Sequence, residues 1–201
     1  MQTDNISVTY TEADRVKQWY AVQTRYQHEQ LTNQVLANKG FETFFPTFAR
    51  IRQWKDRKKK IWEALFPGYL FVADIADRRG QVVTTPGVCS IVCFANLPAL
   101  IPNHEIESIR RAVSSTYPVE PHPSVKQGDR VRVNEGPLSG IEGVLIRKGS
   151  STRLILSIEM LGRAAAVEID RTCVERISPA AAMRDKTIGF SPNPHAQIAS
   201  Y

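Results

Sequence analysis

The sequence predicts an α+β protein of two domains: helices on a mostly antiparallel sheet, followed by a small five-stranded β-barrel. Up to residue 116, stretches of helix-like periodicity alternate with short stretches rich in aromatic and β-branched residues. Residues 117–124 then contain Pro118, Pro121 and Pro123, which favour an extended, semi-rigid linker. Beyond them, only short strand-like stretches follow, separated by glycine-containing or polar turns. This change of pattern marks the domain boundary.

Composition bounds the class of protein. The 201 residues are 42% hydrophobic and 23% charged, as in an ordinary soluble globular protein. No apolar run approaches the roughly 20 residues of a membrane span, and residues 1–17 have mixed charge, unlike a secretory signal. We therefore expect a cytoplasmic monomer without membrane contact.

Cysteine and histidine give no sign of a metal site or a disulfide framework. Cys89 and Cys93 lie on one face of an expected strand but about 13 Å apart, too far to bridge. Cys173 is distant in sequence, no C-x-x-C occurs, and the four histidines are scattered singly. We expect no metal and no cofactor.

The first domain is expected over residues 18–116, after a flexible tail at 1–17. Its expected elements are, in order, a strand over 19–24, a helix over 28–39, extended segments over 41–52 and 61–65 around a hairpin tip at 53–60, a strand over 69–72, a short helix or turn over 77–84, a strand over 88–94 and a helix over 103–115. Leu31, Val35 and Leu36 supply the apolar stripe of the first helix, and Gly40 marks its end.

The hairpin tip carries the formal net charge of +6 almost by itself. Between residues 50 and 60 the single acid Asp56 stands among seven bases: Arg50, Arg52, Lys55, Arg57, Lys58, Lys59 and Lys60. Trp54 and Trp62 flank them, and aromatic rings beside cations suit nucleic acid, through stacking and cation–π contact. The alternative is a solvated hairpin whose lysines only keep an edge strand from aggregating.

Residues 65–72, Leu-Phe-Pro-Gly-Tyr-Leu-Phe-Val, are the most aromatic stretch of the chain. Pro67-Gly68 marks a turn, and the strand after it alternates, so Tyr69 and Phe71 share one face. Two interpretations are open. Either this is a central strand buried on both faces, or its second face presents an aromatic surface.

The second domain is expected over residues 125–178, with a disordered tail at 179–201. Strands over 130–133, 143–146, 153–158 and 165–169, with a last one near Val174, predict an SH3-like barrel. Its β-branched residues and glycines disfavour helix, so we expect a constitutive barrel that swings free of the first domain. Its turns offer side chains that belong either to a protein-docking surface or to the core: Leu138, Ile141, Met160 and Leu161.

Catalytic patterns are absent from the sequence. Ser139 in Gly136-Pro-Leu-Ser-Gly140 stands at the wrong place for a G-x-S-x-G nucleophile elbow, and no phosphate loop or paired carboxylates occur. We do not expect an enzyme.

Several motifs, in this order, resemble the family of NusG-type transcription elongation factors. They are Trp19-Tyr20-Ala21-Val22, then residues 65–72, then Val131-Arg-Val-Asn-Glu-Gly-Pro137, then Gly162-Arg163. The resemblance covers residues 18–178 and is strongest to the specialised RfaH and UpxY paralogues. It implies an NGN domain followed by a KOW domain, and a transcription antitermination factor serving a specialised set of operons such as polysaccharide clusters.

The resemblance also implies partners and sites in the first domain. The aromatic pocket that holds the β′ clamp helices of RNA polymerase corresponds to Phe66, Pro67, Tyr69 and Phe71, with Trp19 and Tyr20 beside them. The segment facing the β gate loop corresponds to Arg78-Arg79-Gly80, where the His-Thr-Thr stretch of RfaH is absent. Nontemplate DNA or nascent nucleic acid would meet Arg25, His28 and Lys39, while the hairpin would add Arg57, Lys58, Lys59 and Lys60.

For the barrel, the resemblance implies that loops at residues 138–141 and 160–163 contact a small-subunit ribosomal protein (NusE) or Rho. The residues concerned are Leu138, Ile141, Met160, Leu161 and Arg163. The alternative function is that of a KOW-type RNA-binding or ribosome-associated protein without a polymerase role. The barrel's near-balance of basic and acidic residues speaks against that alternative.

Overall fold

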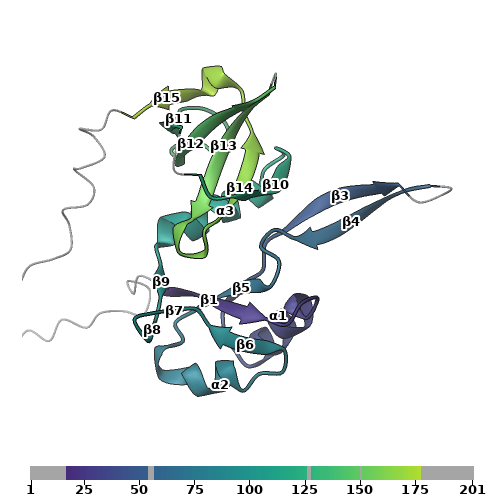
Figure 1. Ribbon diagram of the computed structural model, residues 1–201, viewed down its shortest axis with the longest axis vertical. Helices are drawn as coiled ribbons and strands as arrows, with labels where there is room; N and C mark the ends of the chain where they lie inside the picture. The colour runs from purple at the N-terminus through teal and green to yellow at the C-terminus, as the bar shows by residue number, and fades with distance from the viewer. Residues whose placement is uncertain (1–16, 54–56, 126–127, 150, 178–201) are drawn as a thin grey trace, which may run out of the picture.

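The computed structural model describes residues 17–53, 57–125, 128–149 and 151–177. It has an N-terminal α/β half, a β-rich C-terminal half and a hairpin that projects beside them (Figure 1). The expected flanking tails and Trp54 lie outside the described residues. The predicted fold class is confirmed, because a mixed domain with an antiparallel sheet precedes an all-strand domain.

The N-terminal sheet is antiparallel in all its pairings, with the strand order β2-β5-β1-β6 and a short β9 pairing with β1. Its elements are β1 (Trp19–Thr24), α1 (Glu29–Asn38), β2 (Thr43–Phe44), β5 (Tyr69–Ala73), η2 (Ala76–Arg78), α2 (Arg79–Val83), β6 (Val88–Ile91), β7 (Cys93–Phe94), β8 (Leu97–Pro98), β9 (Leu100–Ile101) and α3 (Asn103–Ser114).

Both faces of this sheet are covered. Leu70 and Val72 of β5 pack with Leu36 of α1 on one face. Phe71, on the other face, packs with Ile106 and Ile109 of α3 in a second cluster. The strand alternation predicted for residues 69–72 is therefore confirmed, and β5 is a central strand buried on both sides.

Helix α1 differs from its prediction in one detail. Leu36 is buried as expected, but Leu31 is 55% exposed, because it lies on the solvent side of this short helix. Gly40 follows the helix with a φ of 78°, the left-handed conformation expected of a glycine that ends a helix. Helix α3 begins at Asn103 as expected, and Pro102 is its N-cap.

The hairpin consists of β3 (Thr47–Gln53) and β4 (Lys58–Ala64), which pair only with each other among the described strands. In Figure 1 it extends away from both sheets.

The C-terminal sheet has six antiparallel strands in the order β10-β14-β13-β12-β11-β15. They are β10 (Val119–Pro123), β11 (Asp129–Val133), β12 (Glu142–Lys148), β13 (Ser151–Ile158), β14 (Arg163–Glu168) and β15 (Val174–Arg176), with η3 (Glu159–Leu161) and η4 (Arg171–Cys173) between them. The last five strands match the expected barrel strands, and we refer to the six-stranded unit as the barrel.

Two expectations about the proline segment need correction. Residues 119–123 are extended as predicted, but they form β10, an edge strand paired with β14, and are not a free linker. Proline suits this position because an edge strand has backbone N–H groups that need no partner in the sheet. The barrel is also not free of the first domain, because it packs against α3, which lies between the two sheets (Figure 1).

Candidate interaction surfaces

The aromatic residues predicted to hold the polymerase form a packed cluster under α3. The Phe71 ring stacks on Phe44 at a centroid distance of 6.0 Å, and Phe66 meets Phe71 edge-on at 5.6 Å. Trp19 meets Phe44 edge-on at 6.5 Å, and the Arg110 guanidinium of α3 lies over both of these rings. Such ring pairs stabilise the domain. Trp19, Phe66 and Phe71 are therefore core residues in this conformation.

The rim of this cluster is more accessible. Pro67 is exposed and Tyr69 is half-buried, and both lie where the chain turns into β5. Gly68, between them, has a φ of 82° and donates its backbone N–H to Glu29 Oε1 at 2.8 Å. The hydrogen bond to Glu29 of α1 thus fixes this turn, and the turn places the Tyr69 ring at the edge of the aromatic cluster.

Tyr20 does not join the predicted group. It belongs to the opposite face of the sheet, with Leu36 and Val82, and its hydroxyl donates to Gln18 Oε1 at 3.1 Å. Burial, reinforced by the nearby Asp74 carboxylate, raises the pKa of this phenol. The resemblance implied both Trp19 and Tyr20 beside the pocket, whereas neighbours in a strand point to opposite faces.

Polar contacts of α3 and of the Tyr69 rim join the barrel to the N-terminal domain. The Arg163 guanidinium lies 5.2 Å from the centre of the Tyr69 ring. Arg111 Nη2 donates to the carbonyl oxygens of Pro137 and Ser139, each at 2.8 Å. The backbone N–H of Glu159 donates to Glu105 Oε2 at 3.3 Å. We call this set of contacts, between α3 with the Tyr69 rim and the barrel loops, the interdomain contact.

Glu105, Arg110 and Arg111 could not be identified from the sequence, because nothing local shows that a barrel covers α3. The spacing of these three residues indicates only that they lie on the polar surface of a helix. Long-range docking decides that these side chains lie at the interdomain contact.

The barrel loops predicted to bind partners divide into core and surface. Leu138 is 0% exposed and Ile141 is buried, so both belong to the core, as one of the two interpretations held. Met160 is exposed, Leu161 packs at the edge of the core, and Arg163 covers Tyr69. The structure therefore brings both predicted loops to the interdomain contact, although only part of each is accessible there.

The two faces of the hairpin differ in chemistry. On one face, Arg50 and Arg52 share the Glu63 carboxylate, with N–O distances of 3.2 and 3.4 Å. On the other, Trp62 is 66% exposed, and Lys60 Nζ lies 5.3 Å from its ring centre. The ion pairs found among the described residues do not include Arg57, Lys58 or Lys59. Among the described hairpin residues, the basic side chains outside these ion pairs therefore lie at the start of β4, with Lys60 beside an exposed indole.

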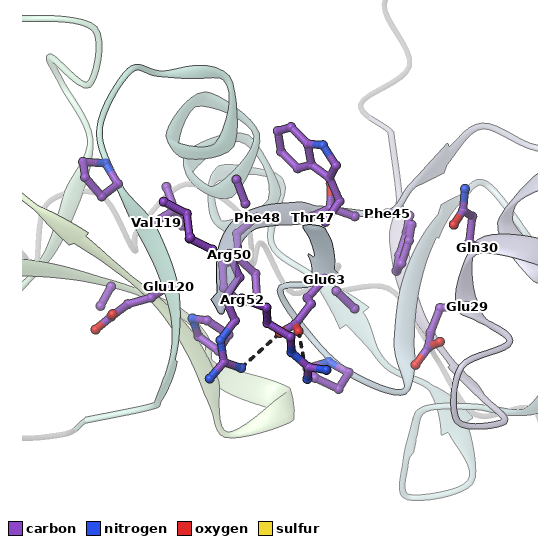
Figure 2. Close-up of a pocket in the computed structure, with 18 of the residues that line it drawn as sticks. Glu29, Gln30, Phe45, Thr47, Phe48, Arg50, Arg52, Glu63, Val119 and Glu120 are labelled. Carbon is purple, nitrogen blue, oxygen red and sulfur yellow. Dashed lines mark hydrogen bonds and ion pairs between the residues drawn. The ribbon is translucent and has the colours of Figure 1, made fainter. Parts of the chain in front are cut away.

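A cleft of about 1490 Å³ separates the hairpin from α1 and the barrel edge (Figure 2). Arg50, Arg52 and Glu63 lie at its centre, between Glu120 on the barrel side and Glu29 on the α1 side. The Arg153 guanidinium pairs with Glu120. Charges of both signs thus alternate along the cleft, which gives it no net attraction for phosphate.

The three other predicted nucleic-acid residues do not form one patch. Arg25 and His28 are exposed in the turn before α1. Lys39 lies at the far end of that helix, where its Nζ donates to Thr85 Oγ1 at 2.6 Å and to the Gln81 carbonyl at 3.1 Å. Lys39 is therefore a structural contact between α1 and α2.

Arg78, in the segment expected to face the β gate loop, is engaged inside the domain. Its Nη2 donates to the Lys39 carbonyl oxygen at 2.6 Å, and its guanidinium carbon lies 3.9 Å from the centre of the Phe41 ring. The neighbouring Arg79 is exposed.

Within the described part of the chain, no group of three or more potential ligands among His, Cys, Asp and Glu is arranged to hold a metal ion. None of the helices described is long and apolar enough to cross a membrane.

Comparison with known proteins gives a consistent result. A family model described as "Transcription termination factor nusG" matches residues 17–110. The chain is 30% identical over 183 residues to the transcription termination/antitermination protein NusG of Lactococcus lactis, covering 87% of this chain and 98% of the relative. It is 27% identical over 177 residues to the Escherichia coli protein of the same name, covering 80% and 96%. A solved structure described as "Domain interaction in Thermotoga maritima NusG" aligns with a TM-score of 0.46 at 23% identity, over 81% of this chain and 98% of that one.

Proposed function

This chain belongs to the NusG family of transcription termination/antitermination proteins, and from that premise we propose that it binds RNA polymerase through the Tyr69 rim. The proposed ligand is the β′ clamp-helix pair, and the outcome is antitermination on a specialised set of operons. The observation that carries the proposal is a preformed aromatic cluster whose rim, Pro67 and Tyr69, is held in place by the Gly68–Glu29 hydrogen bond. Rigid aromatic anchors of this kind dominate protein interfaces.

The barrel limits access to this rim. Arg163 lies over the Tyr69 ring, and the segments containing Leu65 and Pro67 face Arg163 and Pro121 across a small cleft. A helical partner therefore needs the barrel to move away before it reaches Tyr69. We propose that polymerase binds the open form of the protein, in which the interdomain contact is broken.

Opposite effects of two substitutions in the full chain test this proposal. Tyr69→Ala removes the anchor and should weaken binding to a β′ clamp-helix fragment by more than about thirtyfold, the effect of a loss above 2 kcal/mol. Arg163→Ala removes only the cover and should strengthen the same binding. Phe94→Ala, at an exposed ring on β7 that lines neither of the two clefts at Pro67, is the control and should leave the affinity unchanged. Equal affinity for the Tyr69→Ala variant and the wild type would refute the proposed site.

We also propose that the hairpin tip contacts nucleic acid on the elongation complex without reading its sequence. Each phosphate contact on duplex DNA adds roughly 0.9 to the salt slope of log affinity. Neutralising Lys58, Lys59 and Lys60 together should flatten that slope by up to about 3, equally on unrelated sequences. Glu63→Gln is the counterpart: it frees Arg50 and Arg52 and should steepen the slope. An unchanged salt slope in the triple variant would refute the proposed contact and would mean that the three lysines are only solvated.

The remaining assignments follow from the family. We propose a cytoplasmic protein with an NGN-type domain over residues 18–116 and a KOW-type barrel over 125–178. Met160, Leu161 and Arg163 would contact a ribosomal protein or Rho in the open form, with Leu138 and Ile141 supporting the loop from inside. Arg25 and His28 are the exposed candidates for contact with nontemplate DNA.

A further inference from the structure

One carboxylate of the interdomain contact is buried. Glu105 lies in the first turn of α3 and is 8% exposed, because η3 of the barrel covers it. Its Oε2 receives one hydrogen bond, from the backbone N–H of Glu159. An ionised carboxylate that leaves water needs a cation or several donors to offset the lost hydration.

The charged side chains around Glu105 do not supply that compensation. The barrel elements that contact this turn of α3 are β13 and η3, whose charged side chains are Arg153 and Glu159, and Arg163, which follows η3, lies over the Tyr69 ring. Arg153 is paired with Glu120, and Glu159 has the same charge as Glu105. The ionisable neighbours on α3 itself are His104, Glu107, Arg110 and Arg111. Glu107 and Arg110 pair with each other. Arg111 donates hydrogen bonds to the carbonyl oxygens of Pro137 and Ser139. None of the ion pairs found in the described part of the chain includes Glu105.

We propose that Glu105 is a proton-controlled latch between α3 and the barrel: the protonated carboxyl group allows the domains to dock, and its ionisation favours their separation. The latch itself concerns only this chain. Its consequence, that proton loss exposes the Tyr69 rim, rests on the proposed function.

The direction of the effect follows from the pKa of Glu105. Burial, more than the like charge of Glu159, raises this pKa from 4.5 to about 7 in the docked form, against a smaller lowering by the Glu159 N–H. In the separated form η3 no longer covers the first turn of α3, and the pKa returns towards its ordinary range. At pH values between these two pKa values, the docked form therefore binds more protons than the separated form. Docking is strongest below the lower pKa, weakens as pH rises towards about 7, and is constant above it.

The size of the effect is bounded by the same pKa difference. Each unit corresponds to about tenfold in the docking constant, so the full range is up to about three hundredfold. Between pH 5 and pH 8 we expect the wild-type constant to fall by more than about tenfold.

The test measures domain docking in the full chain by ¹⁵N relaxation, since docked domains tumble together and separated ones tumble independently. Sub-denaturing urea, titrated at each pH, keeps the docking constant in the measurable range. Glu105→Gln keeps the size of the side chain and an acceptor for the Glu159 N–H but has no charge. It should dock at least as tightly as the wild type at pH 5 and should lose the pH dependence.

Two further variants make the result specific. Glu107→Gln changes an exposed carboxylate on the same helix and should keep the wild-type pH profile. Glu159→Gln removes the neighbouring like charge and should strengthen docking at high pH while the pH dependence remains. A wild-type docking constant that changes less than about twofold from pH 5 to pH 8, or a Glu105→Gln profile identical to it, would overturn the latch.

Binding of the clamp-helix fragment across the same pH range separates the two proposals. If docking follows Glu105 but no variant binds the fragment at any pH, the latch stands and the proposed function fails. If the fragment binds but the docking constant does not depend on Glu105, the proposed function stands and the latch fails.

Discussion

Phe71 is a buried ring at the centre of the aromatic cluster of the N-terminal domain. It is 0% exposed, lies on the central strand β5, and its ring touches those of Phe44 and Phe66. Truncating a buried phenylalanine to alanine costs about 3–5 kcal/mol, and the cost is larger when the site cannot collapse. Here Arg110 packs over Phe44, and Phe66 is itself fully buried, so neither ring can move into the space. We expect Phe71→Ala to lose about 4 kcal/mol.

The assay is urea unfolding of the full chain, followed by the fluorescence of Trp19, which packs in the same cluster. Replacing Trp54 and Trp62 by phenylalanine leaves Trp19 as the only indole, since the chain has three tryptophans. With a urea slope of about 2 kcal/mol per molar, the midpoint should fall by about 2 M. Phe94→Ala, at a ring that is 77% exposed, should shift the free energy of unfolding by less than about 0.5 kcal/mol.

A loss below about 1 kcal/mol for Phe71→Ala would refute this account of the cluster, because it would mean that the aromatic face relaxes freely. For the same reason, Phe71 is not a suitable position for mapping polymerase binding. Any loss of binding in that variant would mix unfolding with the removal of a contact, whereas Tyr69 lies at the rim.

Three further predictions concern packing elsewhere. Leu138→Ala should cost about 2–5 kcal/mol in barrel stability and Met160→Ala less than about 0.5, measured by thermal unfolding; equal losses would contradict the division of the loops into core and surface. Gly143→Ala should destabilise the barrel, because a Cβ there would lie 2.7 Å from the Ile155 carbonyl oxygen. Gly80→Ala in α2 adds a Cβ that meets no atom within 4 Å, so this change should be neutral or stabilising. A lower melting temperature for Gly80→Ala than for Gly143→Ala would be inconsistent with this packing. Lys39→Met should lower the free energy of unfolding by about 1 kcal/mol and leave DNA affinity unchanged, and a loss of DNA affinity without a loss of stability would return Lys39 to the nucleic-acid surface.

The sequence predicts those features of the fold that depend on the geometry of a few neighbouring residues. The alternation of Leu70, Phe71 and Val72 determined which side chains share a face, and the glycine after α1 marked its end, since both depend on backbone geometry within a few residues. The same information does not say what covers a face. Phe71 was therefore placed on the correct side of the sheet without any indication that α3 would bury it.

For the proline segment, the local conformation could be predicted from the sequence but the strand pairing could not. Its extended conformation was predictable because proline fixes φ. Its pairing with β14 depends on residues some forty positions later, and an isolated stretch with two prolines in five residues gives no strand signal. Likewise, the basic run at the hairpin was visible in the sequence, but the neutralisation of Arg50 and Arg52 by Glu63 required the register of β3 on β4.

The pairing of β10 has a consequence for how far the two domains can part. Because β10 belongs to the barrel, only residues 115–118 lie between the end of α3 and the barrel sheet. A fully stretched tether of this length spans about 18 Å. After separation, each domain therefore meets the other at an effective local concentration in about the millimolar range. A partner that holds the domains apart must compete continuously with this intramolecular re-association, and lengthening the tether would weaken that competition without touching either surface.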